Sequence, residues 1–317
     1  MTRYLAELSL EAFTEAARNV PYQQIDSDLF PGIDLWIRRD DLIDPLISGN
    51  KAYKLIYNLL EARKQSKDTI VTCGGAWSNH IHATAAAGQR FGFKTIGIIR
   101  GERPPVLSAM LQDAERFGME LRFVSRSVYR ERDKPEFLLK LGAGYEHCWY
   151  VPEGGANTQG AKGVQILGDV IHEGSPVEFD EYWLPCGTGL TLGALASNSP
   201  SSVTVRGVAV LKAGEGIRRT AEAWSRDKSN RSAPFEVIAN GHCGGYAKVT
   251  QNLARFFGDA QLQTKIPLDW VYVAKAALQV SNQAASRETI LRLRGRNPKI
   301  LLIHTGGLQG NRGISTS

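Results

Sequence analysis

The sequence predicts an α/β protein built on parallel sheets. After residue 30, short apolar runs rich in β-branched residues alternate with longer helical stretches. The runs are almost continuously apolar, which favours strands that helices cover on both faces. A third observation is that glycine-rich polar loops follow many of these runs. A length of 317 residues is typical of about two domains.

The expected strands and helices follow from the period of the apolar residues and from the flanking turns. We expect strands at residues 35–39, 69–73, 95–100, 120–124, 148–151, 181–186, 203–210, 235–239 and 299–305. We expect helices at residues 50–65, 78–91, 105–117, 160–173, 190–197, 214–225 and 270–292. No repeat or low-complexity linker separates them, so a domain boundary should be a crossover of the chain.

Composition excludes several classes of function. The chain has 38 basic and 32 acidic residues, and this mild excess in interrupted runs argues against a nucleic-acid surface. No apolar run approaches the roughly 18 residues of a membrane span. The N-terminal residues do not resemble a secretory signal, so we expect a cytoplasmic protein without a membrane partner. The four cysteines form no C-x-x-C pair, so we expect buried free thiols.

Five expected strand ends are followed by glycine-rich polar loops. The loops read "GGAWSNHIH" after Cys73, "PEGGANTQGAKG" after Val151, "CGTGLTLG" after Pro185, "NGHCGGYAK" after Ala239 and "HTGGLQG" after Ile303. Open parallel sheets bind ligands beyond the carboxyl ends of their strands. We therefore expect these loops to share one binding site.

The loop from Gly187 to Thr191 has the features of a phosphate site. Its glycines allow close backbone approach, and the helix that follows would direct free N–H groups at an anion. The spacing G-x-G-x-x-x-G does not fit a dinucleotide fingerprint, and a P-loop motif is absent. The pattern favours a smaller phosphate ligand, with a tight strand-to-helix turn as the alternative interpretation.

The stretch "SGNKAYKL" places Lys51 directly after a Gly-Asn turn where a helix begins. Turns held by rigid elements commonly carry functional groups. Lys54 follows three residues later and therefore shares a helix face with Lys51. An amine held here in a desolvated site would have a lowered pKa and could act as a nucleophile or a base.

Read together, the loops resemble a known family. The segments "IRRDDLIDPLISGNKAYKL", "TCGGAWSNHIHATAAAG", "VPEGGANTQGAKG", "LPCGTGLTLGAL", "IPLDWVYVAKA" and "IHTGGLQG" occur in this order. They resemble the pyridoxal-phosphate enzymes of the D-cysteine desulfhydrase and 1-aminocyclopropane-1-carboxylate deaminase family. The resemblance implies the tryptophan-synthase-β-like fold (fold type II), with pyridoxal 5'-phosphate between two open, twisted, mostly parallel-sheet domains. It implies a larger cofactor domain of residues 1–52 and 161–317, a smaller inserted domain of residues 53–160, and a homodimer.

The resemblance also assigns roles to residues of the motifs. Catalytic roles fall on Lys51, Ser78, Tyr246 and Tyr272. Cofactor contacts fall on Lys51 (Schiff base), Lys54 (phosphate), Asn79 (3-oxygen), Gly187, Thr188, Gly189, Leu190, Thr191 (phosphate), Tyr272 (ring face) and Thr305 (pyridine nitrogen). Substrate contacts fall on Trp77, Ser78, Asn79, His80 and Tyr246.

Some of these residues have simpler interpretations. Ser78 could be only a helix cap, and Tyr246 and Tyr272 could be ordinary aromatic residues of the core or its rim. We expect no metal site, because His80 and His82 would point in different directions from one helix. His304 fits a polar group at a strand end better than a catalytic group.

Three residues depart from the family pattern. Trp77 stands where glutamine is usual, and Leu190 replaces a glycine of the phosphate loop. Val273 stands where threonine or glutamate is usual near the pyridine nitrogen. A carboxylate there would strengthen the electron sink that ring opening needs, whereas β-elimination of a thiolate needs less help.

The sequence thus favours a pyridoxal-phosphate-dependent lyase acting on a small amino acid. We expect β-elimination like that of a D-cysteine desulfhydrase, giving a 2-oxo acid and ammonia. Three alternatives remain open: deamination of the cyclopropane amino acid, racemisation or another reaction of the same cofactor, and a non-catalytic metabolite-binding protein.

Overall fold

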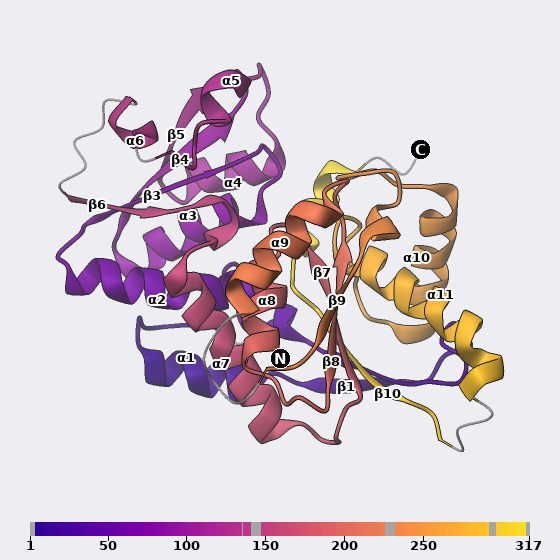
Figure 1. Ribbon diagram of the computed structural model, residues 1–317. Helices are drawn as coiled ribbons and strands as arrows, with labels where there is room; N and C mark the ends of the chain where they lie inside the picture. Colours follow the sequence, from indigo (N-terminus) through magenta and orange to yellow (C-terminus); the bar gives the residue numbers. More distant parts are fainter. Residues whose placement is uncertain (1–3, 135, 141–146, 226–231, 292–295, 315–317) are drawn as a thin grey trace.

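The structure contains two β-sheets that lie side by side, each with its own helices (Figure 1). It is a computed structural model that describes residues 4–134, 136–140, 147–225, 232–291 and 296–314. The smaller sheet is formed by the middle of the chain, and the larger sheet by segments from both chain ends. The predicted α/β class with mostly parallel sheets is confirmed.

The smaller sheet has four parallel strands. Their spatial order is β5 (Met119–Val124), β4 (Lys94–Arg100), β3 (Thr69–Gly74) and β6 (Cys148–Val151). Its helices are α3 (Asn79–Phe91), α4 (Ala109–Arg116), α5 (Arg126–Tyr129) and α6 (Phe137–Lys140). All six residues of β3 are buried, as expected for a central strand.

The larger sheet has six strands, of which only the edge strand among the described residues runs antiparallel to its neighbour. The spatial order is β1 (Tyr22–Ile25), β2 (Asp34–Arg38), β10 (Lys299–Ile303), β7 (Glu181–Cys186), β8 (Thr204–Ala209) and β9 (Phe235–Ile238). Parallel pairing aligns the carboxyl ends of β10, β7 and β8, and the loops predicted after Pro185 and Ile303 begin at the first two of these strands.

Two groups of helices cover the larger sheet on opposite faces (Figure 1). One group is α8 (Leu190–Ser197) and α9 (Gly214–Ser225) with α7 (Thr158–Gly174), α2 (Asn50–Lys64) and α1 (Leu10–Arg18) packed beside them. The other group is α10 (Gln251–Thr264) and α11 (Val273–Leu291). Short 3-10 helices complete the chain: η1 (Asp40–Leu42), η3 (Glu153–Gly155), η4 (Ala239–His242) and η5 (Leu308–Gly313).

The observed helices differ from the expected ones where caps and short elements were missed. The helix expected from 105 begins at Ala109, because Ser108 caps it by accepting the N–H of Leu111. The helix expected from 270 begins at Val273. Five helices and strands of the described residues had no counterpart in the expectation: α1, the edge strand β1, α5, α6 and α10.

The four cysteines are free thiols, as expected, although their burial differs. Cys73 and Cys186 are buried, whereas Cys148 and Cys243 are half-buried. Within the described ranges, no helix combines the length and apolar character needed to cross a membrane.

Close packing of α2 against α7 yields a stability prediction. A Cβ added at Gly163 would lie 1.7 Å from the carbonyl oxygen of Tyr53. Gly163→Ala should therefore force the helices apart and lower the free energy of unfolding by about 1–3 kcal/mol in urea denaturation. Gly174→Ala is the control, because Gly174 lies on the same helix with no atom within 4 Å of the added carbon. Equal urea midpoints for the two variants would contradict this packing.

Candidate active site

The turn before Lys51 is held between the ends of two strands of the larger sheet. Gly49 has a φ of 61°, and a Cβ there would lie 2.0 Å from the carbonyl oxygen of Thr305, so only glycine fits. The Asn50 N–H donates to that same oxygen at 3.3 Å. The Asn50 side-chain amide donates to the hydroxyl of Thr191 at 3.2 Å. The turn thus joins the loop after β10 to the loop after β7.

Lys51 is half-buried at the N-terminus of α2. Its Nζ donates to the side-chain oxygen of Asn50 at 2.7 Å. Burial lowers the pKa of Lys51 to about 8, and the carboxylate of Asp269 acts in the opposite direction. About a tenth of the amine is therefore neutral at pH 7, far more than for an ordinary lysine, which suits a nucleophile or a base.

Lys54 lies one helical turn further along α2 and is buried. Its Nζ donates to the carbonyl of Gly154 at 3.0 Å. Burial lowers its pKa well below the usual value, and the charge of Lys51 lowers it further. An ammonium has three donors, so an anion placed here would meet donors that one carbonyl does not occupy.

The N-terminus of α3 supplies a second set of donors. The hydroxyl of Ser78 caps the helix by accepting a hydrogen bond from the N–H of Ile81 at 3.3 Å. The backbone N–H of Ser78 donates to the Gly75 carbonyl. The capping role is thus present, and the Ser78 O–H remains a donor for a ligand. A helix N-terminus also favours bound anions such as a carboxylate.

Two polar side chains in the first turn of α3 lack partners. The Oδ1 of Asn79 and both ring nitrogens of His80 are buried without a hydrogen bond to any described residue. The His80 ring lies beside Gly155 and near Lys54. Burial lowers the pKa of His80, and the positive charges of Lys51 and Lys54 lower it further. Buried polar groups are normally paired, so these atoms point to a ligand.

The predicted phosphate loop joins β7 to α8. Gly189 has a φ of 92°, and a Cβ there would lie 2.5 Å from the carbonyl oxygen of Ile217. No side chain caps α8, so its first N–H groups lack a side-chain acceptor. The Leu190 side chain is fully buried in the core. Leucine in place of glycine therefore puts no side chain on the surface of the loop, where backbone groups remain. Thr188 lies beside Gly154, which binds Lys54.

Two tyrosines lie close together on the larger domain. The Tyr272 and Tyr246 rings are 6.5 Å apart at 74°, and Tyr272 lies beside Gly187 of the phosphate loop. The hydroxyl of Tyr246 donates to the carbonyl of Trp77, across the junction between the domains, at 3.2 Å. Tyr272 is half-buried and Tyr246 is 38% exposed, but desolvation of their hydroxyl ends raises the pKa of both phenols, so both keep their protons at neutral pH.

Asp269 is a site residue that the sequence interpretation missed. Its buried carboxylate accepts the N–H groups of Val271, Tyr272 and Val273, which caps α11 and fixes the backbone of Tyr272. It also interacts electrostatically with Lys51. The signal was present in the sequence, because an aspartate just before a helix is a typical cap.

Val273 does not lie where the family pattern suggests. Its side chain is fully buried in the core that α10 and α11 form with the sheet. It therefore faces the core and not a ligand, and the expectation that it bears on the pyridine nitrogen loses its support. Thr305, at the end of β10, remains beside the Gly49–Asn50 turn.

The remaining predicted residues have clear surroundings. The half-buried ring of Trp77 packs on Gly313 of η5.

His304 is buried, with Nε2 2.8 Å from the Pro267 carbonyl and Nδ1 3.5 Å from Asp41, which fits a structural role. His82 pairs with Asp113 at 3.3 Å and is separate from His80. Across the described ranges, no cluster of three His, Cys, Asp or Glu side chains could hold a metal ion.

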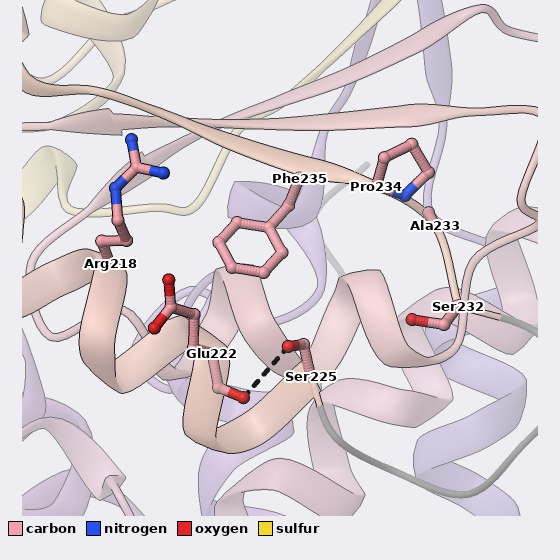
Figure 2. Close-up of a pocket in the computed structure, with 7 residues that line it drawn as sticks. All are labelled: Arg218, Glu222, Ser225, Ser232, Ala233, Pro234 and Phe235. Carbon is pink, nitrogen blue, oxygen red and sulfur yellow. Dashed lines mark hydrogen bonds between the residues drawn. The ribbon is translucent and has the colours of Figure 1, made fainter.

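A surface hollow lies elsewhere, between α9 and the start of β9 (Figure 2). Its lining is Arg218, Glu222, Ser225, Ser232, Ala233, Pro234 and Phe235. None of the predicted site residues lines it. We therefore place the candidate active site at the junction of the two sheets, where the chemistry-bearing residues meet.

The donors at this junction fit pyridoxal 5'-phosphate. Lys54, the N-terminus of α8 and the unpaired His80 suit its phosphate, and the side-chain N–H groups of Asn79 suit a ring oxygen. Lys51 offers the amine that its aldehyde requires, and Tyr272 offers an aromatic face. Asn79, His80 and the start of α8 belong to two of the five glycine-rich loops, whereas Lys51, Lys54 and Tyr272 come from other segments.

Comparisons with known proteins agree with this fit. Residues 14–253 match the family model described as pyridoxal-phosphate dependent enzyme. A putative 1-aminocyclopropane-1-carboxylate deaminase of Thermotoga maritima is 31% identical, over 88% of this chain and 90% of its own length. The bifunctional D-cysteine desulfhydrase/1-aminocyclopropane-1-carboxylate deaminase of Arabidopsis thaliana is 29% identical, over 88% of this chain and 73% of its own.

A solved structure extends the likeness to the whole fold. The crystal structure of an ACC deaminase homologue superposes with a TM-score of 0.72 at 28% identity, covering 92% of this chain and 90% of that one. The protein therefore has the fold type II architecture. The chain belongs to the family of pyridoxal-phosphate-dependent enzymes, in the group of lyases and deaminases that includes 1-aminocyclopropane-1-carboxylate deaminase and D-cysteine desulfhydrase.

Proposed function

We propose that the protein is a desulfhydrase-type lyase that converts D-cysteine into pyruvate, hydrogen sulfide and ammonia. The observation that carries the proposal is Lys51, an amine with a pKa of about 8 held by a rigid turn beside the predicted phosphate loop. The name of the Arabidopsis relative, which covers both activities, supports this class of substrate.

Lys51 is suited to be the base. The bound cofactor supplies the electron sink that makes the α-hydrogen of an amino acid acidic. In its neutral form, Lys51 Nζ can take that proton. The Cβ–S bond then breaks, its electron pair leaves with sulfur, and hydrolysis of the remaining enamine gives pyruvate and ammonia. The cyclopropane amino acid has no hydrogen on Cα, so this base has no α-proton to remove from it.

The substrate carboxylate has a natural place at α3. The Ser78 hydroxyl and the first N–H groups of the helix favour a carboxylate there. This places the amino acid between the smaller domain, which binds the carboxylate, and the larger domain, which carries Tyr246 and Tyr272. The pair of protonated phenols could donate hydrogen bonds to the departing sulfur.

The surroundings of α11 favour elimination over ring opening. Val273, the α11 residue at the family's position for this partner, is apolar and turned into the core, so it supplies no carboxylate to the pyridine nitrogen. The Asp269 carboxylate already accepts three backbone N–H groups. Without a carboxylate partner the electron sink is weaker, which suffices for a good leaving group such as a thiolate.

Lys51→Ala tests the central residue. The unaltered protein loaded with cofactor should carry it covalently on the peptide that contains Lys51, detectable by mass spectrometry after borohydride reduction. Lys51→Ala should lose this modification and all turnover. Lys54→Ala should keep the attachment but bind the cofactor at least about tenfold more weakly, because it loses a charged contact to phosphate. Attachment of the cofactor to another lysine in the unaltered protein would refute the assignment.

The lowered pKa of Lys51 gives a pH prediction. The neutral amine increases as pH rises through about 8, so the rate of covalent cofactor capture by the apoprotein should rise with a midpoint near 8. Because the Asp269 carboxylate raises the pKa of Lys51, Asp269→Asn should move the midpoint to lower pH. Asp259→Asn, at an exposed position on α10, is the control and should leave it unchanged. A midpoint above 10 in the unaltered protein would contradict the desolvated environment of Lys51.

Product analysis tests the reaction itself. The cofactor-loaded protein should release sulfide and pyruvate in equal amounts from D-cysteine, with kcat/KM at least about a hundredfold above that for the cyclopropane amino acid. Release of 2-oxobutanoate from the cyclopropane acid at a comparable rate would replace this proposal with the deaminase activity. Interconversion of enantiomers without release of ammonia would identify a racemase. Cofactor binding without any of these products would support the non-catalytic alternative.

A further inference from the structure

A buried lysine on α11 has no part in the chemistry described above. The side chain of Lys275 is fully buried, and among the described residues the carboxylate that acts on it is that of Asp269, with which it forms no ion pair. Burial lowers the pKa of Lys275. Placing an ammonium in such surroundings costs free energy unless hydrogen bonds compensate, so its contacts should explain its presence.

The contacts of Lys275 are two carbonyl groups of one loop. Its Nζ donates to the carbonyl of His242 at 2.8 Å and to that of Gly245 at 2.7 Å. These two residues flank a tight turn, in which the Gly245 N–H also donates to the His242 carbonyl at 3.0 Å. The lysine therefore binds both ends of the turn that directly precedes Tyr246.

This loop has an unusual backbone. Cys243 and Ala247 have φ values of 49° and 53°, in the left-handed region that side chains disfavour. Gly244 and Gly245 have φ values of 91° and 133°. Non-glycine residues in this region persist only when the surrounding structure holds them. The two hydrogen bonds from Lys275 supply such a restraint at the centre of the strained segment.

The loop carries Tyr246 to the site. The Tyr246 hydroxyl donates to the Trp77 carbonyl at 3.2 Å, and its ring lies against Tyr272. Lys275 follows Tyr272 by three residues, which is about one helical turn. The start of α11 therefore positions both phenol rings. Tyr272 directly precedes the helix, and Tyr246 lies on the loop that Lys275 binds.

We propose that Lys275 is a positioning residue, whose hydrogen bonds to His242 and Gly245 hold Tyr246 at the substrate side of the active site and against Trp77 of the smaller domain. This rests on the proposed function only in taking Tyr246 to face the substrate. The restraint on the loop itself is independent of which amino acid is turned over.

Hydrogen exchange tests the restraint without any substrate. In the cofactor-loaded protein, Lys275→Met should speed amide exchange of residues 243–248 by about tenfold or more, because the loop loses its two bonds. Lys248→Met removes the same charge from an exposed position in the same loop and should leave exchange unchanged. If Lys275→Met does not fold, Lys275→Gln, which keeps an N–H donor, replaces it and should show a smaller acceleration. Unchanged exchange in a folded variant would overturn the proposal.

A double-mutant cycle tests whether Lys275 acts through Tyr246. With D-cysteine, Lys275→Met and Tyr246→Phe should each lower kcat/KM by about tenfold, mainly through KM. The double variant should be no worse than Tyr246→Phe alone, because effects through one shared group are not additive. Independent, multiplying losses would overturn the assignment. Failure of the unaltered protein to act on D-cysteine would refute the proposed function, and the exchange experiment would still decide the role of Lys275.

Discussion

Lys51 and Lys54 lie one helical turn apart on α2, half-buried and buried respectively, and the rest of the site depends on this pair of amines. Burial lowers the pKa of both, and the charge of Lys51 further lowers that of Lys54. Such a pair is unfavourable in a protein that binds nothing, because each ammonium destabilises the other. An anionic ligand reverses the sign of the interaction. A phosphate at Lys54 can remain ionised there, while Lys51 stays neutral enough to react.

Three helix N-termini add positive electrostatic potential around Lys51 and Lys54. The N-termini of α2, α3 and α8 all lie at loops of the predicted site, and each directs the positive end of a helix dipole there. Parallel strands bring these helix ends to one side of each sheet. Close backbone approaches hold the arrangement: a Cβ at Gly49 would meet Thr305, and one at Gly189 would meet Ile217. Gly49 and Gly189 are therefore needed for close packing of the backbone as well as for access of a ligand to the loops.

Much of this arrangement could be predicted from the sequence, because strand ends and glycine-rich loops are local signals. The position of Lys51, the loop after β7 and most element boundaries follow from such signals. The rest depends on contacts between distant segments. Nothing local shows that Lys275 binds the loop at His242, 33 residues earlier in the chain, or that the Trp77 ring reaches Gly313. The direction of the Val273 side chain depends on where the Asp269 cap starts α11.

The three departures from the family pattern therefore differ in their consequences. The side chains of Leu190 and Val273 enter the core, so they leave the surface of the site to backbone groups. Trp77 is different, since its ring rests on η5 of the larger domain and its carbonyl accepts the hydroxyl of Tyr246. The Arg312 side chain of η5 in turn pairs with Asp113 on α4. The group that would shape the substrate side is thus also a contact between the domains. A substrate that displaced Tyr246 from the Trp77 carbonyl would therefore break a hydrogen bond that joins the loop after β3 to the loop after β9.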